Sequence, residues 1–128
     1  MSAMSDYLEN EILDHILGTG AYTMPTTVYV GLSTGSFGDD NSGTELSGSG
    51  YARQSISFGA AASGTASNDA AVEFPAATGS WGTVSHFGLF DAASSGNLLI
   101  HGALTASKVI ETGDILKIAV GDMDITAA

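Results

Sequence analysis

One short segment of the chain matches a catalytic motif. Residues 31–35 read Gly-Leu-Ser-Thr-Gly, the G-x-S-x-G pattern of a nucleophile elbow. That motif works when a strand turns sharply into a helix, because the turn exposes the serine beneath an oxyanion hole. A strand precedes the motif here, but residues 36–41 (Ser-Phe-Gly-Asp-Asp-Asn) cannot begin a helix. A chance match is expected among 17 glycines and 16 serines, so we expect no catalytic residue.

The three histidines are the next candidates for chemistry. His86 and His101 lie on the two arms of a predicted hairpin, and one register makes them cross-strand neighbours. Zinc needs a third and usually a fourth ligand, and the chain has no cysteine to supply one. We therefore favour a paired structural role and predict no metal. His15 falls outside the apolar stripe of a predicted helix, and Asp91 is typical of a turn.

The acidic segment 39–45 suggests calcium, because Asp39 and Asn41 fit the first two ligand positions of an EF-hand loop. Gly43 then falls where the third ligand is needed, so a solvated loop is the better interpretation. No glycine-rich stretch lies between a strand and a helix with a lysine behind it, which argues against a phosphate site. We predict no cofactor.

The single tryptophan, Trp81, lies between glycines just before the predicted hairpin. It is either an exposed contact residue, since tryptophan is enriched at interfaces, or a core residue under a loop, which we favour. Trp81, Tyr29 and Tyr51 could also stack on sugars if they shared one face of a sheet.

Composition limits the classes of function. A length of 128 residues fits a single domain, 1–128, without disulfides. Fourteen acidic and three basic residues give a net charge of −11, which argues against nucleic acid and anionic membranes as partners. No apolar run approaches the ~20 residues of a membrane span, and no secretory signal is visible. We expect a soluble protein made in a cytoplasm.

Alanine, glycine, serine and threonine together make 63 of the 128 residues. Leucine, isoleucine, valine and phenylalanine still number 29, just above the ~20% below which disorder is expected. We therefore expect a folded, glycine-rich β domain with few polar groups that could converge on an enzyme site.

A helix over about 5–17 is the first predicted element. Ser5 or Asp6 can cap its start, and Gly18 suits its end. Apolar residues recur at helical spacing and form one stripe: Leu8, Ile12, Leu13, Ile16 and Leu17. A helix this short is unstable alone, so the stripe must pack on its own sheet or on a partner. We take Leu8, Ile12 and Ile16, with Trp81, as the candidate partner interface.

Six to eight strands follow from about 27 to 126, because apolar residues recur there with a period of two. The predicted strands are 27–33, 51–58, 70–74, 83–91, 97–104, 108–111, 115–120 and 123–126. The five-residue linker 92–96 between two of them indicates a β-hairpin. The predicted fold is mainly β, an antiparallel β-sandwich or small barrel with one N-terminal α-helix.

The order of the segments along the chain resembles a family of small virion proteins of tailed bacteriophages, often labelled tail-fibre-like. The segments that carry this resemblance are Tyr7-Leu8-Glu9-Asn10, Leu13-Asp14-His15-Ile16-Leu17-Gly18, Pro25, Val28-Tyr29-Val30-Gly31-Leu32-Ser33-Thr34, Gly50-Tyr51-Ala52-Arg53-Gln54, Ser67-Asn68, Phe74-Pro75-Ala76-Ala77-Thr78, Trp81-Gly82-Thr83-Val84, Phe87-Gly88-Leu89-Phe90-Asp91-Ala92, Gly96-Asn97-Leu98-Leu99 and Thr112-Gly113-Asp114. The resemblance implies a structural role, with no activity and no cofactor. Labels in the family range from tail fibre to head fibre to undefined structural protein.

We therefore expect a non-enzymatic structural protein on the exterior of a phage particle. A peripheral tail, neck or fibre-associated component ranks above a capsid decoration (cement) protein, and its partners are other virion proteins and copies of itself. Strand edges and the helix stripe are the surfaces expected to meet these partners. A carbohydrate-binding module that recognises a host-surface glycan and an enzyme that uses Ser33 are the alternatives from other classes.

Overall fold

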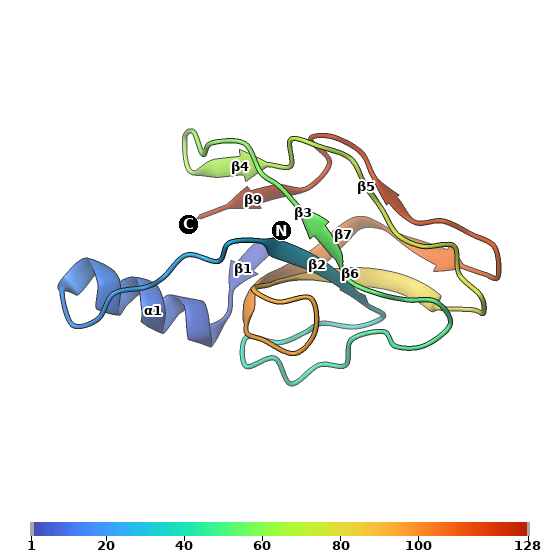
Figure 1. Cartoon of the computed structure of the whole chain (residues 1–128), viewed down its shortest axis with the longest axis horizontal. Coiled ribbons are helices and arrows are strands. Elements are labelled where there is room, and N and C mark those ends of the chain that lie inside the picture. Colours follow the sequence, from blue (N-terminus) through green and yellow to red (C-terminus); the bar gives the residue numbers. More distant parts are fainter. Residues whose placement is uncertain (1, 128) are drawn as a thin grey trace.

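The computed structural model describes residues 2–127, and they form one helix and nine strands (Figure 1). The elements are β1 (Ser2–Met4), α1 (Asp6–Leu17), β2 (Val28–Ser33), β3 (Gln54–Ile56), β4 (Thr65–Ser67), β5 (Val72–Glu73), β6 (Gly82–Phe90), β7 (Leu98–Ile110), β8 (Lys117–Ile118) and β9 (Asp124–Thr126). The predicted helix is confirmed, and its caps explain its limits. The Ser5 side chain accepts a hydrogen bond from the Leu8 N–H, and Gly18 ends the helix with φ of 83°.

The main sheet has five antiparallel strands in the order β1-β7-β6-β2-β3. Its centre is the predicted hairpin of β6 and β7, which pairs Phe90 with Leu98 beside the turn. Asp91 holds this turn by accepting hydrogen bonds from the backbone and side-chain nitrogens of Asn97, at 2.7 and 3.0 Å. The prediction that Asp91 forms the turn is therefore confirmed.

The strand β7 is longer than predicted, because the segments expected at 97–104 and 108–111 form one strand with a large bulge. Its register pairs His86 with Ala103 and Val84 with Lys108, so that Ser85 alone lies opposite four residues of β7, 104–107. A bulge of this kind bends and twists a strand. In this molecule the bulge allows the single strand β7 to extend alongside both of the short sheets, β4-β9 and β5-β8, that form the second layer.

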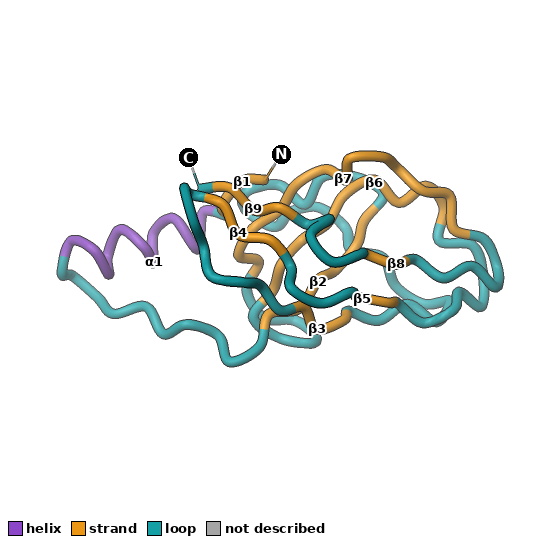
Figure 2. Tube along the Cα trace, turned by 90° about the horizontal axis from the view of Figure 1, so that it is seen from above, coloured by secondary structure: helices purple, strands orange, loops and turns teal. Residues whose placement is uncertain are grey.

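Two short two-stranded sheets, β4-β9 and β5-β8, cover the main sheet (Figure 2). The molecule is therefore antiparallel and sandwich-like, as predicted, and residues 2–127 form no closed barrel. The strands predicted at 51–58, 70–74 and 115–120 shorten to β3, β5 and β8. Conversely, β1 and β4 were not predicted, and both contain mostly small or polar residues.

The core lies between these layers and is built from both. The main sheet contributes Val30, Leu32, Val84, Phe87 and Leu89, while the covering segments contribute Val72, Phe74, Leu116, Ile118 and Met123. Trp81 is only 5% exposed and belongs to this core. A smaller cluster of Phe37, Phe90 and Leu98 fills the space beside the hairpin turn.

The helix α1 and the return segment 18–27 project from the sheets as an arm (Figure 1). Backbone bonds fix the base of this arm: the Ser5 N–H donates to Leu99 O and the Asp6 N–H donates to Asp39 O, both at 2.8 Å. The arm therefore starts at a defined point of the sheet and extends away from it.

Candidate interaction surface

The Gly31–Gly35 motif does not present a nucleophile. Ser33 is 2% exposed, and its hydroxyl donates to Thr44 O at 2.6 Å and accepts from the Gly35 N–H at 3.1 Å. Gly31 is closely surrounded, because a Cβ there would lie 2.8 Å from Glu45 Oε2 and 3.1 Å from Phe90 Cε1, and these side chains would have to shift. The Ser33 side chain of this motif thus holds β2 to the loop that follows it.

The histidines are not paired with each other, so the register that made them cross-strand neighbours is wrong. His86 lies opposite Ala103, and His101 lies opposite Gly88. The register is constant from the Leu89–Ile100 pair to the His86–Ala103 pair, so the two histidines are offset by two positions. His101 Nε2 contacts Asp39 Oδ1 at 2.7 Å instead, and His86 Nδ1 contacts Ser85 Oγ at 2.7 Å. His15 is exposed on the arm, where its Nδ1 accepts a hydrogen bond from the Tyr22 N–H at 3.1 Å.

The acidic loop is stabilised by its own hydrogen bonds. Asp40 Oδ1 accepts from the Ser42 N–H at 3.1 Å, and the hydrogen bonds from Ser42 hold the pKa of Asp40 below its usual value. Across residues 2–127, no group of three or more histidine and acidic side chains is arranged to hold a metal ion.

Of the aromatic residues proposed for sugar stacking, Trp81 is buried, whereas Tyr29 and Tyr51 are partly buried. Tyr51 packs edge-on against Trp81 with ring centroids 5.5 Å apart, and it stacks on Phe74 at 6.2 Å. The Trp81 indole N–H donates to Ser49 O at 2.9 Å. Trp81 is thus a core residue under a loop, which is the interpretation that the sequence favoured. Because its side chain is buried, Trp81 is not part of the exposed surface.

A charged cluster that the sequence analysis did not identify lies at β3. The Arg53 side chain is 8% exposed, pairs with Glu45 at 2.7 Å and lies 3.6 Å above the ring of Phe90. Its Nη1 donates to Ala92 O and Ser95 O at 2.9 and 2.8 Å, which anchors the hairpin loop. Arg53 is the only arginine in the chain, but the sequence does not show which of the fourteen acidic residues pairs with it.

Tyr51 completes the cluster. Its hydroxyl donates to Glu45 Oε2 at 2.5 Å and accepts from the Leu32 N–H at 2.9 Å. Burial, together with the hydrogen bond to Glu45, raises the pKa of Tyr51 well above its ordinary value. The hydroxyl of Tyr51, the carboxylate of Glu45 and the guanidinium of Arg53 all have hydrogen-bond partners, which is typical of a structural network.

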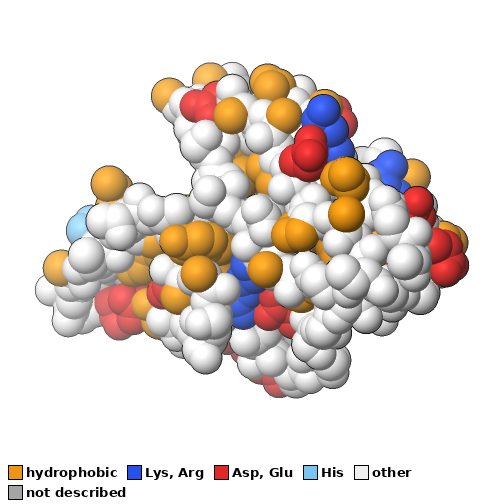
Figure 3. Space-filling model, turned by 45° about the vertical axis from the view of Figure 1, so that its right-hand side comes forward, with side chains coloured by type: hydrophobic (Ala, Val, Ile, Leu, Met, Phe, Trp, Pro, Cys, Tyr) orange, Lys and Arg blue, Asp and Glu red, His pale blue; other side chains and the backbone are white. Residues whose placement is uncertain are grey.

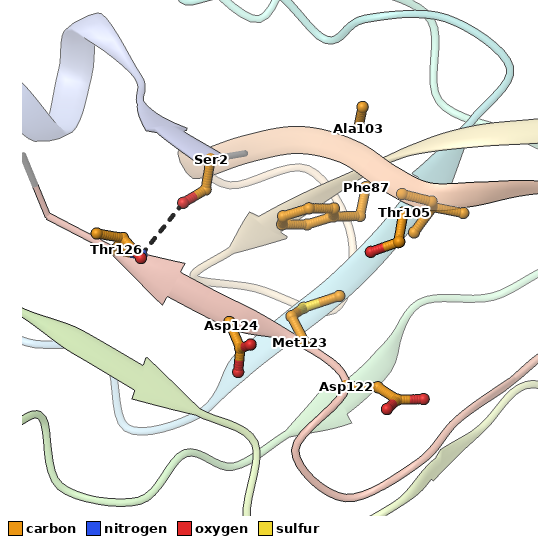
Figure 4. A pocket seen from close by; sticks show the side chains of 9 residues that line it. Ser2, Phe87, Ala103, Thr105, Asp122, Met123, Asp124 and Thr126 are labelled. Atoms are coloured by element: carbon orange, nitrogen blue, oxygen red, sulfur yellow. Dashed lines mark hydrogen bonds between the residues drawn. The ribbon is translucent and has the colours of Figure 1, made fainter.

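A cleft of about 500 Å³ lies between β9 and the bulged part of β7 (Figure 4). Phe87 and Met123 point into it, whereas Asp122 and Asp124 point away from its centre. Asp124 accepts a hydrogen bond from Ser67 Oγ at 2.5 Å, and Ser2 Oγ accepts one from the Thr126 N–H at 3.3 Å. These groups form no arrangement of nucleophile, base and oxyanion donor.

The residues predicted for a partner interface divide between the core and the surface. Leu8 is 7% exposed and packs on the body of the molecule, Ile12 is half-buried and Ile16 is 71% exposed. Leu13, Leu17 and Met24, which were not named as interface residues, are also exposed on the arm. Leu8 and Ile12 therefore fix the base of the arm, and the exposed apolar residues lie toward its tip.

An apolar groove of about 300 Å³ opens at the base of the arm (Figure 3). It is lined by Leu8, Tyr22, Pro25, Val28, Phe58, Ala66, Leu89, Leu99, Ile100 and Ile125. The arm, β4, β9 and the main sheet all contribute to it, so no single stretch of sequence could reveal it. The exposed apolar residues of the arm and the apolar groove at its base are features typical of an interaction surface.

No helix within residues 2–127 has the length and apolar character needed to cross a membrane. No curated protein matches the chain significantly. A family model described as podophage GP4 fiber I protein gp80 matches residues 3–126, from β1 to the end of β9. Because this match covers the arm, the main sheet and the second layer, the chain belongs to this family of phage fibre proteins.

Proposed function

We propose that the protein is a non-enzymatic structural component on the outside of a phage particle, folded as a single domain over 1–128. It is a peripheral tail, neck or fibre-associated protein that attaches to its neighbours through the arm and the edges of its sheets. Membership of a phage fibre family supports the structural role. The observation that carries the mode of attachment is the arm, which exposes Ile16 at 71% and Leu17 at 71%.

Exposed apolar side chains on a projecting helix are costly for an isolated protein and favour contact with another protein. The buried network around Arg53 and Glu45 favours the non-enzymatic assignment, because its polar groups are satisfied internally. The acidic surface suits the exterior of a particle better than a surface that faces DNA.

The test is the location and number of copies in purified virions, by cryo-electron microscopy and quantitative mass spectrometry. Copies at the tail, the neck or a fibre support the proposal. Many copies at capsomer junctions would instead indicate a cement protein, and a chain missing from the particles would contradict any virion role.

A further inference from the structure

The arm exposes four large apolar side chains. Leu13, Ile16, Leu17 and Met24 are 55%, 71%, 71% and 79% exposed. They are four of the seven large hydrophobic side chains exposed in the described part of the chain. Three of them, Leu13, Ile16 and Leu17, lie in the last two turns of α1 at the tip of the arm, and Met24 lies on the return segment between Tyr22 and Pro25.

The charges around this surface have one sign. The helix α1 has four acidic residues, Asp6, Glu9, Glu11 and Asp14, and residues 1–52 contain no lysine or arginine. Glu9 shares a face with Leu13 and Ile16, because they follow it by four and seven positions, which is about one and two turns of the helix.

None of the residues that line the groove at the base of the arm is acidic, but the charges of Asp91 and Glu11 act on Tyr22, which is one of them. Burial raises the pKa of Tyr22, which lines the groove, and the charges of Tyr7, Asp91 and Glu11 raise it further. The apolar tip and the apolar groove are therefore both next to carboxylates.

A second copy of the chain has little positive charge to offer this surface. Its cations are Arg53, Lys108 and Lys117. Arg53 is buried against Glu45, and Lys117 lies 4.0 Å from Glu73. Two copies would each bring a net charge of −11, so contact between two arms would place carboxylates against carboxylates.

We propose that the arm binds a different protein, one whose apolar side chains are bordered by lysine or arginine. Its apolar residues cover the tip and enter the groove, while its cations pair with Glu9, Glu11 and Asp14. The inference rests on the proposed function and adds the chemistry of the partner. The acidic border also disfavours self-association through the arm, since like charges across an interface suppress wrong partners.

Carbodiimide cross-linking of intact virions tests the charge pairing, because this reagent joins a carboxylate directly to a neighbouring lysine amine. We expect cross-links from the carboxylates of α1 to a lysine of another virion protein. Cross-links from these carboxylates to Lys108 or Lys117 of a second copy would overturn the proposal.

Variant phages separate the apolar contribution from the charged one. Ile16→Asp is expected to lower the copies per virion at least about tenfold, because it places a charge in an apolar contact. The double variant Glu9→Gln, Glu11→Gln is expected to lower the copies per virion about fivefold, which corresponds to the loss of two surface ion pairs. It should also remove most of the dependence of attachment on salt concentration. Val120→Asp is the matched control, because Val120 is 60% exposed on another part of the molecule.

The outcomes distinguish this inference from the proposed function. If the wild-type chain is missing from virions, the proposed function fails. If the chain is present and Ile16→Asp is retained normally, the virion role stands and the arm does not attach it. Another outcome is that virions lose Ile16→Asp but retain the double glutamine variant normally at every salt concentration. That result would show that the partner is apolar and has no basic border. Circular dichroism of the purified full-length variants ensures that reduced retention does not reflect unfolding.

Discussion

Arg53 connects the loop that carries Glu45 to the distant end of the β6–β7 hairpin. Its guanidinium pairs with Glu45, lies on the ring of Phe90 and donates to the backbone of the 92–96 loop. Arg53→Ala removes these contacts and leaves the Glu45 carboxylate, 22% exposed, without its cation. We expect a loss of about 3 kcal/mol in the free energy of unfolding, measured by urea denaturation.

Lys117→Ala is the control for this effect. Lys117 and Glu73 lie 4.0 Å apart and are both mostly exposed, so their pair is worth less than about 1 kcal/mol. Arg53→Ala combined with Glu45→Gln is expected to recover part of the stability, because no carboxylate then stays unpaired. Equal effects of Arg53→Ala and Lys117→Ala would contradict the anchoring role of Arg53.

Tyr51 makes stability depend on pH in the alkaline range. Its pKa is raised in the folded protein, so the unfolded chain releases the phenol proton first, near the ordinary value of about 10. The contribution is fully present below that pH and is lost as the pH rises above it. We expect the free energy of unfolding to fall steadily above about pH 10, measured by urea denaturation at each pH.

Tyr51→Phe tests whether this residue causes the slope. The variant loses hydrogen bonds to Glu45 and Leu32, so it is less stable at neutral pH by about 1–2 kcal/mol. Its stability should fall less steeply above pH 10 than that of the wild type. Some slope should persist, because the pKa values of Tyr7 and Tyr22 are also raised. An unchanged slope would contradict the assignment.

At the scale of elements, Ser5 joins the arm to the sheet. Its hydroxyl accepts from the Leu8 N–H at 3.2 Å and donates to Leu98 O at 2.5 Å, and the residue is 1% exposed. Ser5→Ala therefore removes the helix cap and leaves a buried carbonyl without this donor. We expect a loss of about 2 kcal/mol in thermal or urea unfolding, with faster hydrogen exchange in α1. Ser94→Ala, on the exposed hairpin loop, should change stability by less than about 0.5 kcal/mol.

The elements that could be predicted from sequence are those whose signals are local. The helix has Ser5 before it and Gly18 after it, and the hairpin has two apolar runs separated by five residues. The strands β1 and β4 contain mostly small or polar residues and exist because β7 and β9 pair with them. Their partners are distant in sequence, so no local pattern could indicate them.

The same distinction applies to the candidate interaction surface. Leu8, Ile12 and Ile16 were identified as one stripe, but the sequence could not show which part of it faces the body of the molecule. The structure buries Leu8 and exposes Ile16. The groove combines residues from Leu8 to Ile125, so it depends on the whole fold and could not be read from any one motif.

At the scale of the whole molecule, most of the negative charge has no cation nearby. Fourteen acidic residues face three basic ones, and the described ion pairs of lysine and arginine are Arg53–Glu45 and Lys117–Glu73. Folding brings the remaining carboxylates closer together than they are in the unfolded chain, and their mutual repulsion destabilises the compact state. Salt screens exposed charges over about 8–10 Å at 0.1–0.15 M, so added salt should relieve this repulsion.

We therefore expect the free energy of unfolding in urea to rise by about 1 kcal/mol between low salt and about 0.5 M sodium chloride. A matched variant with Glu9→Gln, Glu111→Gln and Asp122→Asn loses three carboxylates, which takes the net charge from −11 to −8. It should be more stable than the wild type at low salt and should gain less from added salt. A free energy of unfolding that falls with salt would instead mean that the few ion pairs outweigh the repulsion. That result is not expected, because the Arg53 pair is largely shielded from solvent and the Lys117 pair is weak.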